Sequence, residues 1–196
     1  MIRGIAMVAV VIAGPALADE LLPKQQVLGD FAKCVVKQAP DQSRKLMATS
    51  IDTPEERKAA KALVDGLDSC LAGRAVLSMR TGEVRGAVAE ALLSQDVERL
   101  VKLRAMRPQV PVRAASAQGR AFVAGYARCI ANAEPGKGIV LIATGNGTPE
   151  ERAAFVALGT TLNDCMPQGV AYRVSIRDVR NHMADALYRM SGAPNA

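Results

Sequence analysis

The pentapeptide Thr-Pro-Glu-Glu-Arg occupies Thr53–Arg57 and returns 95 residues later at Thr148–Arg152. At each occurrence the Thr hydroxyl is placed to accept a hydrogen bond from the N–H of the second Glu, and Pro suits the first helical position. The two carboxylates also lie at the positive end of the helix dipole. The pentapeptide therefore predicts the start of a helix, twice. This role explains the paired carboxylates without catalysis, because adjacent residues on a helix do not face each other.

The same offset relates the four cysteines of the chain. It carries Cys34 onto Cys129 and Cys70 onto Cys165 without a gap. Self-similarity at a fixed spacing is typical of an internal repeat. The sequence therefore predicts two tandem copies of one unit.

The composition favours a mainly α fold. The chain of 196 residues contains three Phe, three Tyr and no Trp, and 49% of its residues are hydrophobic. Apolar residues recur at helical spacing, whereas weak alternation near residues 75–81 and clear alternation at 170–176 indicate short extended segments. We expect about three helices in each unit. The predicted boundaries are 1–18 for a signal peptide, 19–106 for the first unit, 107–119 for a linker and 120–196 for the second unit.

Proline and glycine set the expected helix limits within the units. The first helix should end at Pro40, with at most one further turn over 41–49, and a break is expected at the corresponding residues 135–138. The third helix of the first unit is predicted from about Glu83 to Met106. Its partner in the second unit is predicted to be shorter, from Asp178 to Met190.

The N-terminus has the pattern of a secretory signal. Arg3 precedes an apolar run, Gly4–Gly14, that is too short to span a bilayer, and Ala16–Ala18 matches the small-x-small cleavage pattern. Cleavage would leave Asp19 first, and the alternative is an uncleaved anchor. We expect a periplasmic or secreted protein without a transmembrane segment in its mature form.

Four cysteines in an exported chain predict disulfides. All three pairings respect the repeat. We favour the pairing within each unit, Cys34 with Cys70 and Cys129 with Cys165, because a single ancestral unit could then pair its own two cysteines. Each bridge would stabilise the fold by roughly 4 kcal/mol in the chain-entropy model. Redox or metal chemistry is the alternative, but there is no Cys-x-x-Cys and only one His. We therefore predict no metal and no cofactor.

Positive charge is concentrated between the units. The chain has a formal net charge of +6, and residues 94–123 contain 6 basic against 2 acidic side chains. An Arg also recurs in the third helix of each unit, where it could equally bond within its own unit. Nucleic acid is not an expected partner, because aromatic residues do not interleave the basic ones. The candidate anion-binding residues are Arg85, Arg180, Arg99, Lys102, Arg104 and Arg107.

Three stretches carry a resemblance to known sequences. Phe31-Ala32-Lys33-Cys34-Val35, the distal Cys70 and Arg85-Gly86-Ala87-Val88-Ala89-Glu90-Ala91-Leu92 follow the signal peptide in this order. The combination resembles a group of small exported repeat proteins of Gram-negative bacteria that have no assigned activity. The resemblance implies an exported Cys-containing repeat protein and no site residues.

The functional hypotheses follow from these features. The leading one is a non-enzymatic exported protein whose helical units bind a protein, peptide or envelope component. The second is a small periplasmic enzyme with a dispersed site that includes His182 and Arg180, although His182 lacks a nucleophile motif and is expected at the surface or a helix end. The third is electrostatic attachment of the basic connector to an anionic envelope surface.

Overall fold

The structure is a computed structural model that describes residues 24–66, 68–71, 79–113, 118–167 and 174–192. The expected signal peptide, and most of the two segments expected to be extended, lie outside the described residues. Within the described ranges every regular element is a helix and no strand occurs. The prediction of a mainly helical fold is therefore confirmed.

Three pairs of helices share their bounds at an offset of 95 residues, namely α1 with α6, α2 with α7 and α4 with α10. The first half of the chain contains α1 (Lys24–Gln38), α2 (Pro40–Ala48), α3 (Pro54–Asp65), the short 3-10 helix η1 (Asp68–Leu71), α4 (Thr81–Gln95) and α5 (Val97–Ala105). The second half contains α6 (Gly119–Ala133), α7 (Pro135–Ala143), α8 (Pro149–Val156), α9 (Thr161–Asp164) and α10 (Ile176–Met190).

Two expected interruptions are complete helices. Pro40 and Pro135 do end the preceding helices, but each also occupies the first turn of a new nine-residue helix, α2 or α7. Proline is well tolerated there because the first N–H groups of a helix have no intrahelical partner. The expected break at 135–138 is therefore wrong, and the estimate of about three helices per unit is too low.

The predicted long helix from Glu83 to Met106 is divided at Asp96. Helix α4 ends at Gln95, and the Asp96 side chain accepts a hydrogen bond from the backbone N–H of Arg99 at 3.0 Å, which caps α5. In the second half, α10 begins at Ile176 rather than Asp178 and has 15 residues, as α4 does. The third helix is therefore not shorter in the second half.

The repeated pentapeptide does begin two helices. Thr53 and Thr148 are the N-caps of α3 and α8, and each hydroxyl accepts a bond of 3.2 Å from the N–H three residues later. The Glu56 carboxylate reaches one residue further back than a capping box would place it, to the N–H of Asp52 at 2.9 Å. The equivalent bond from Gly147 to the Glu151 carboxylate is 2.7 Å long.

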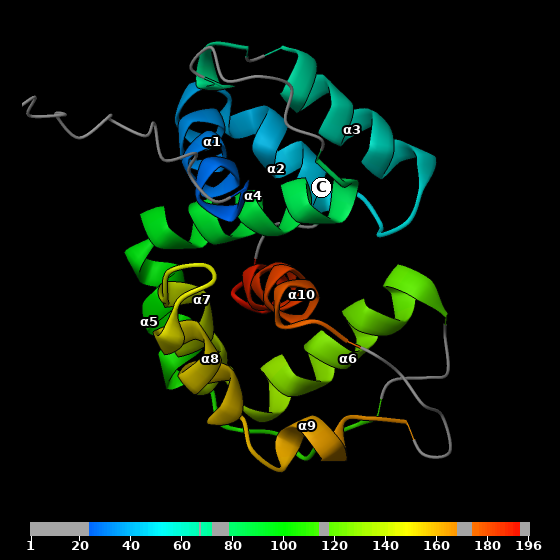
Figure 1. Cartoon of the computed structure of the whole chain (residues 1–196), viewed down its shortest axis with the longest axis vertical. Helices are drawn as coiled ribbons and strands as arrows, with labels where there is room; N and C mark the ends of the chain where they lie inside the picture. Colours follow the sequence, from blue (N-terminus) through cyan, green and yellow to red (C-terminus); the bar gives the residue numbers. More distant parts are fainter. Residues whose placement is uncertain (1–23, 67, 72–78, 114–117, 168–173, 193–196) are drawn as a thin grey trace, which may run out of the picture.

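Helix α10 lies at the centre of the molecule and packs against α4 and α6 (Figure 1). Val179, Met183 and Leu187 on α10 are fully buried within a core that extends through both halves of the chain. The close approach to α4 requires Gly86, because a Cβ atom there would lie 2.5 Å from the Cβ of Asn181. Burial of this apolar helix surface is the main source of stability for such a fold.

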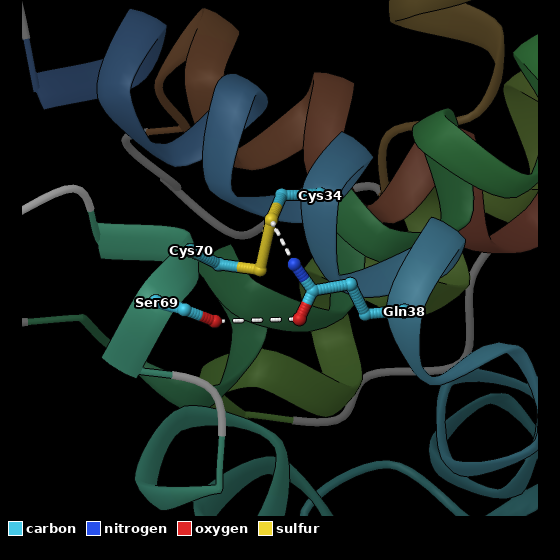
Figure 2. Close-up of a disulfide and its surroundings, with 4 residues drawn as sticks. All are labelled: Cys34, Gln38, Ser69 and Cys70. Carbon is cyan, nitrogen blue, oxygen red and sulfur yellow. Dashed lines mark hydrogen bonds between the residues drawn. A yellow bond between two sulfur atoms is a disulfide. The ribbon is translucent and has the colours of Figure 1, made fainter.

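Both predicted disulfides are present. Cys34 is bonded to Cys70, with Cα atoms 5.6 Å apart, and Cys129 is bonded to Cys165, with Cα atoms 5.7 Å apart. Each bridge ties the first helix of its half to the short helix near the second Cys. Figure 2 shows Gln38 beside the first bridge, where its amide donates to the Cys34 sulfur at 3.4 Å. None of the described helices has the length and apolar character of a membrane span.

Candidate functional site

A cavity of about 480 Å³ opens between the two halves of the chain. Helices α1, α4 and α5 of the first half form one side, while α7, the turn that follows it and the start of α10 form the other. Its volume lies within the usual range for small-molecule sites. The apolar lining side chains include Leu28, Leu93, Leu100, Ile139 and Ile142.

Cationic side chains gather at this cavity. Lys33 on α1, Arg104 on α5 and Arg177 on α10 line it, and all three are exposed. Arg177 lies 3.9 Å from Glu83, and when the Gln25 amide is turned so that its oxygen faces the guanidinium, that oxygen accepts from Nε at 2.7 Å. Lys33 and Arg104 form no hydrogen bond or ion pair with the described residues. The Lys33 charge acts on the Glu90 carboxylate without a direct bond, so the N–H donors of both cations can meet a ligand.

Glu90 is the carboxylate that lines the cavity, and Arg180 lies behind it. The Glu90 oxygens accept bonds of 3.1 Å from Nε and 2.8 Å from one terminal nitrogen of Arg180. Burial raises the pKa of Glu90, while the Arg180 hydrogen bond and charge act in the opposite direction. The paired geometry is the fork arrangement that arginine favours with carboxylates.

The remaining bonds of Arg180 fix the end of α7. Its guanidinium donates to the carbonyls of Leu141 at 2.9 Å, Ile142 at 2.8 Å and Thr144 at 2.8 Å. It also contacts the Thr144 hydroxyl at 3.0 Å and the Glu151 carboxylate at 3.2 Å. Arg180 thus binds carbonyls in the last turn of α7 and just beyond it, where the regular pattern of intrahelical bonds ends.

Arg85 makes the same set of bonds in the first half. Its guanidinium donates to the carbonyls of Leu46 at 3.1 Å, Met47 at 3.0 Å and Thr49 at 3.0 Å, and it lies 3.4 Å from Glu56. Its Nε donates to Asp185, on α10 in the second half, at 2.9 Å. Arg180 likewise takes its carboxylate, Glu90, from the first half. The two arginines therefore each bridge the halves.

The predicted anion-binding residues are separated by the fold. Arg85 and Arg180 are 1% exposed, and each bonds carbonyls of its own half and a carboxylate of the other half. Arg99 pairs with Asp96 at 2.8 Å and stacks over the Tyr188 ring at 4.9 Å. Lys102 and Arg107 are exposed and lie apart from the cavity lining. Of the six residues, Arg104 alone lines the cavity.

His182 is buried, so the expectation of a surface or helix-end histidine is wrong. It is 6% exposed on α10, and its burial, followed by the nearby Arg120 charge, lowers its pKa. It does not line the cavity. The sequence did not indicate its burial because the equivalent residue is Ala87, which gives no clue to the size of the space around position 182.

Sequence reasoning missed the cavity and its residues Lys33, Glu90 and Arg177. A signal for the buried ion pairs was present, because an acidic residue follows each repeated Arg by five positions, as Glu90 or Asp185. The exchange of these carboxylates between halves depends on the α4–α10 crossing and could not be deduced from spacing. Among the described residues, no group of three or more His, Cys, Asp or Glu side chains could hold a metal ion.

Comparisons of the chain with protein-family models, with curated proteins and with solved structures found no match.

Proposed function

We propose that this chain is a non-enzymatic, exported binding protein that holds a small ligand in the cavity between its halves. The observation that carries the proposal is the cavity itself, which combines an apolar lining with the free cations Lys33 and Arg104. Binding sites commonly have this character, with a mostly apolar wall and a few polar groups that orient the ligand. The lining contains no His or Cys, and its carboxylate, Glu90, is already bound by Arg180, which favours binding over catalysis.

The proposed architecture is two copies of one helical unit, related by an approximate two-fold axis. Its support is the shared helix bounds at an offset of 95 residues and the matching bonds of Arg85 and Arg180. Gly86 and Asn181, which correspond at this offset, meet where α4 crosses α10. A contact between corresponding positions is what a two-fold relationship produces.

Export to the periplasm or beyond the cell is part of the proposal. Two disulfides are compatible with an oxidising compartment, and the Arg3 to Ala18 pattern supplies the signal. A non-reducing peptide map of protein purified from the periplasm tests this directly. We expect Asp19 as the first residue and peptides joined through both bridges. A chain that begins at Met1 and stays in the membrane fraction would contradict export.

The binding function is tested by filling the cavity. Ala87→Phe places an aromatic ring on the cavity wall, and Val101→Phe, on an exposed position of α5, is the matched control. Thermal shift against amino acids, short peptides, organic acids and phosphate should find compounds that raise the Tm of the unmodified protein and of Val101→Phe. Ala87→Phe should lose the shift. If no compound raises the Tm, or if Ala87→Phe responds as the unmodified protein does, the cavity is not a binding site.

A further inference from the structure

Three residues of the cavity lining have larger counterparts at the offset of 95 residues. The residues that lie 95 positions from cavity-lining Gln25, Ala87 and Ser94 are Arg120, His182 and Arg189. Three large side chains thus replace three smaller ones. The contacts of these large side chains indicate which hydrogen-bond acceptors remain available at the cavity.

Of the three large side chains, Arg189 makes the contacts that identify the acceptors. Its terminal nitrogen donates to the carbonyl of Met47 at 2.9 Å and to that of Thr49 at 2.8 Å, and its Nε lies 3.2 Å from the Asp185 carboxylate. The same two carbonyls also accept bonds from buried Arg85, both at 3.0 Å. Each carbonyl oxygen therefore serves two guanidinium groups, as its two lone pairs allow.

At the cavity, the corresponding carbonyls at the end of α7 have a single guanidinium donor. The carbonyls of Ile142 and Thr144 each accept from Arg180 at 2.8 Å, and no second side chain among the described residues donates to them. Ser94 stands where Arg189 does, and its hydroxyl bonds the Ala91 carbonyl at 2.8 Å instead. Ile142, Thr144 and Glu90 all line the cavity. The acceptor set that holds Arg189 is thus repeated there without its occupant.

We propose that the cavity binds a ligand with a guanidinium group, which takes at the end of α7 the place that Arg189 takes at the end of α2. This inference rests on the proposed function and specifies its ligand. The guanidinium donates to the carbonyls of Ile142 and Thr144 and lies against the Glu90 carboxylate. Arginine-type groups suit such a site because their planar fork matches several fixed acceptors at once.

The ligand also carries a carboxylate. Lys33 and Arg104 line the same cavity without hydrogen bonds or ion pairs to the described residues, so a purely cationic ligand would be repelled by them. A carboxylate on the same molecule turns this repulsion into attraction. The chemical class is therefore an arginine-type zwitterion, either the free amino acid or an arginine at the C-terminus of a peptide.

Calorimetric titration of the whole mature protein tests the ligand class. The probes are L-arginine, a tripeptide that ends in arginine, L-citrulline, which replaces the guanidinium by a neutral urea, and agmatine, which lacks the carboxylate. We expect citrulline to bind roughly tenfold or more weakly than arginine, because charge-assisted bonds are lost. Agmatine should also bind more weakly than arginine, and added salt should narrow that difference. The tripeptide separates the two sources: tighter binding than arginine assigns a peptide, and weaker binding assigns the free amino acid.

A transplanted arginine provides the matching variant. Ser94→Arg places at the cavity the residue found at position 189, and Gln95→Arg, at the exposed neighbouring position outside the cavity lining, controls for the added charge. We expect Ser94→Arg to lose arginine binding while its Tm is maintained or raised, because the new side chain occupies the site. Gln95→Arg should still bind.

Three results would overturn the inference. The first is equal binding of citrulline and arginine, and the second is arginine binding that persists in a folded Ser94→Arg variant. In the third, simple carboxylates or phosphate bind and arginine does not, in which case the binding function survives but its ligand class is wrong. Failure of every compound to bind would remove both the inference and the proposed function.

Discussion

Gly86 and Asn181 lie 95 residues apart in the sequence and touch at the point where α4 crosses α10. A Cβ atom at position 86 would lie 2.5 Å from the Asn181 Cβ and 2.6 Å from its Cα. The second distance is decisive, because a backbone atom cannot move aside as a flexible side chain can. The two central helices can therefore approach each other this closely only because position 86 has no side chain.

We predict that Gly86→Ala destabilises the protein. Separation of α4 from α10 would disturb packing throughout the core, and overpacking of this kind typically costs about 1–3 kcal/mol. Gly136→Ala is the control, since position 136 is exposed in α7 and has nothing within 4 Å of an added Cβ. Urea denaturation should show a lower midpoint for the first variant and an unchanged or higher one for the second. Equal midpoints would contradict the close crossing.

Arg85→Met should be among the most damaging single substitutions. It leaves the buried carboxylates of Glu56 and Asp185 without this partner, together with the carbonyls at the end of α2. Loss of one member of a buried ion pair costs about 3–5 kcal/mol. Arg44→Met, which removes an exposed pair with Asp41, should cost no more than about 1 kcal/mol. The measurement is the free energy of unfolding of both variants, and similar values would show that the buried network is dispensable.

His182 should make stability depend on pH. Its pKa is lowered from 6.5 by burial and then by Arg120, against the opposing charges of Asp185, Asp178 and Glu56. A base with a lowered pKa binds fewer protons when folded than when unfolded, so stability rises with pH through this window and is complete above 6.5. Acidification below 6.5 should therefore weaken the fold.

Chemical denaturation at about pH 7.5 and pH 5.5 measures this dependence. The change in unfolding free energy between the two pH values should shrink in His182→Ala. This variant has at position 182 the alanine found at the corresponding position 87. The variant will be less stable at the higher pH because of the space it leaves, so the comparison is between pH differences rather than absolute values. An undiminished pH dependence in the variant would assign the effect to other groups.

The two disulfides should differ in their reaction with reductants. Cys129 and Cys165 are 4% and 0% exposed, whereas Cys34 and Cys70 are both partly exposed. Limited treatment with a phosphine, followed by alkylation and peptide mapping, should modify Cys34 and Cys70 first, because reduction requires access to sulfur. Earlier labelling of the second pair would contradict this order.

Removal of either bridge by paired Cys→Ser substitution should lower the free energy of unfolding by about 4 kcal/mol in the chain-entropy model.

Local signals in the sequence predicted local structure well. The caps at Thr53 and Thr148 depend on residues within one helical turn, and these predictions are confirmed. Pro40 was correctly interpreted as the end of one helix but not as the start of the next, because proline suits both positions. Asp96 was missed as a cap because apolar residues continue at helical spacing on both sides of it.

The candidate site could not be predicted because it forms between segments distant in sequence. Whether Arg85 binds a ligand or a buried carboxylate depends on the α4–α10 crossing, which brings Asp185 to its Nε. The correspondence at 95 residues contained a clue to the cavity in the contrast between Ser94 and Arg189. That contrast is interpretable only once the surroundings of Arg189 are known.

The carboxylates exchanged between the halves join them as contacts across an interface join the subunits of a dimer. Arg85 binds Asp185 and Arg180 binds Glu90 in addition to Glu56 and Glu151 of their own halves, so each buried arginine is shared between the two halves. Each half nevertheless has its own disulfide. If the chain were cut between α5 and α6, the two fragments should reassociate as a heterodimer. The peptide connection then serves as a tether that raises the effective concentration of one half near the other. Evolutionary change at Arg85 would accordingly be compensated at Asp185, across the interface.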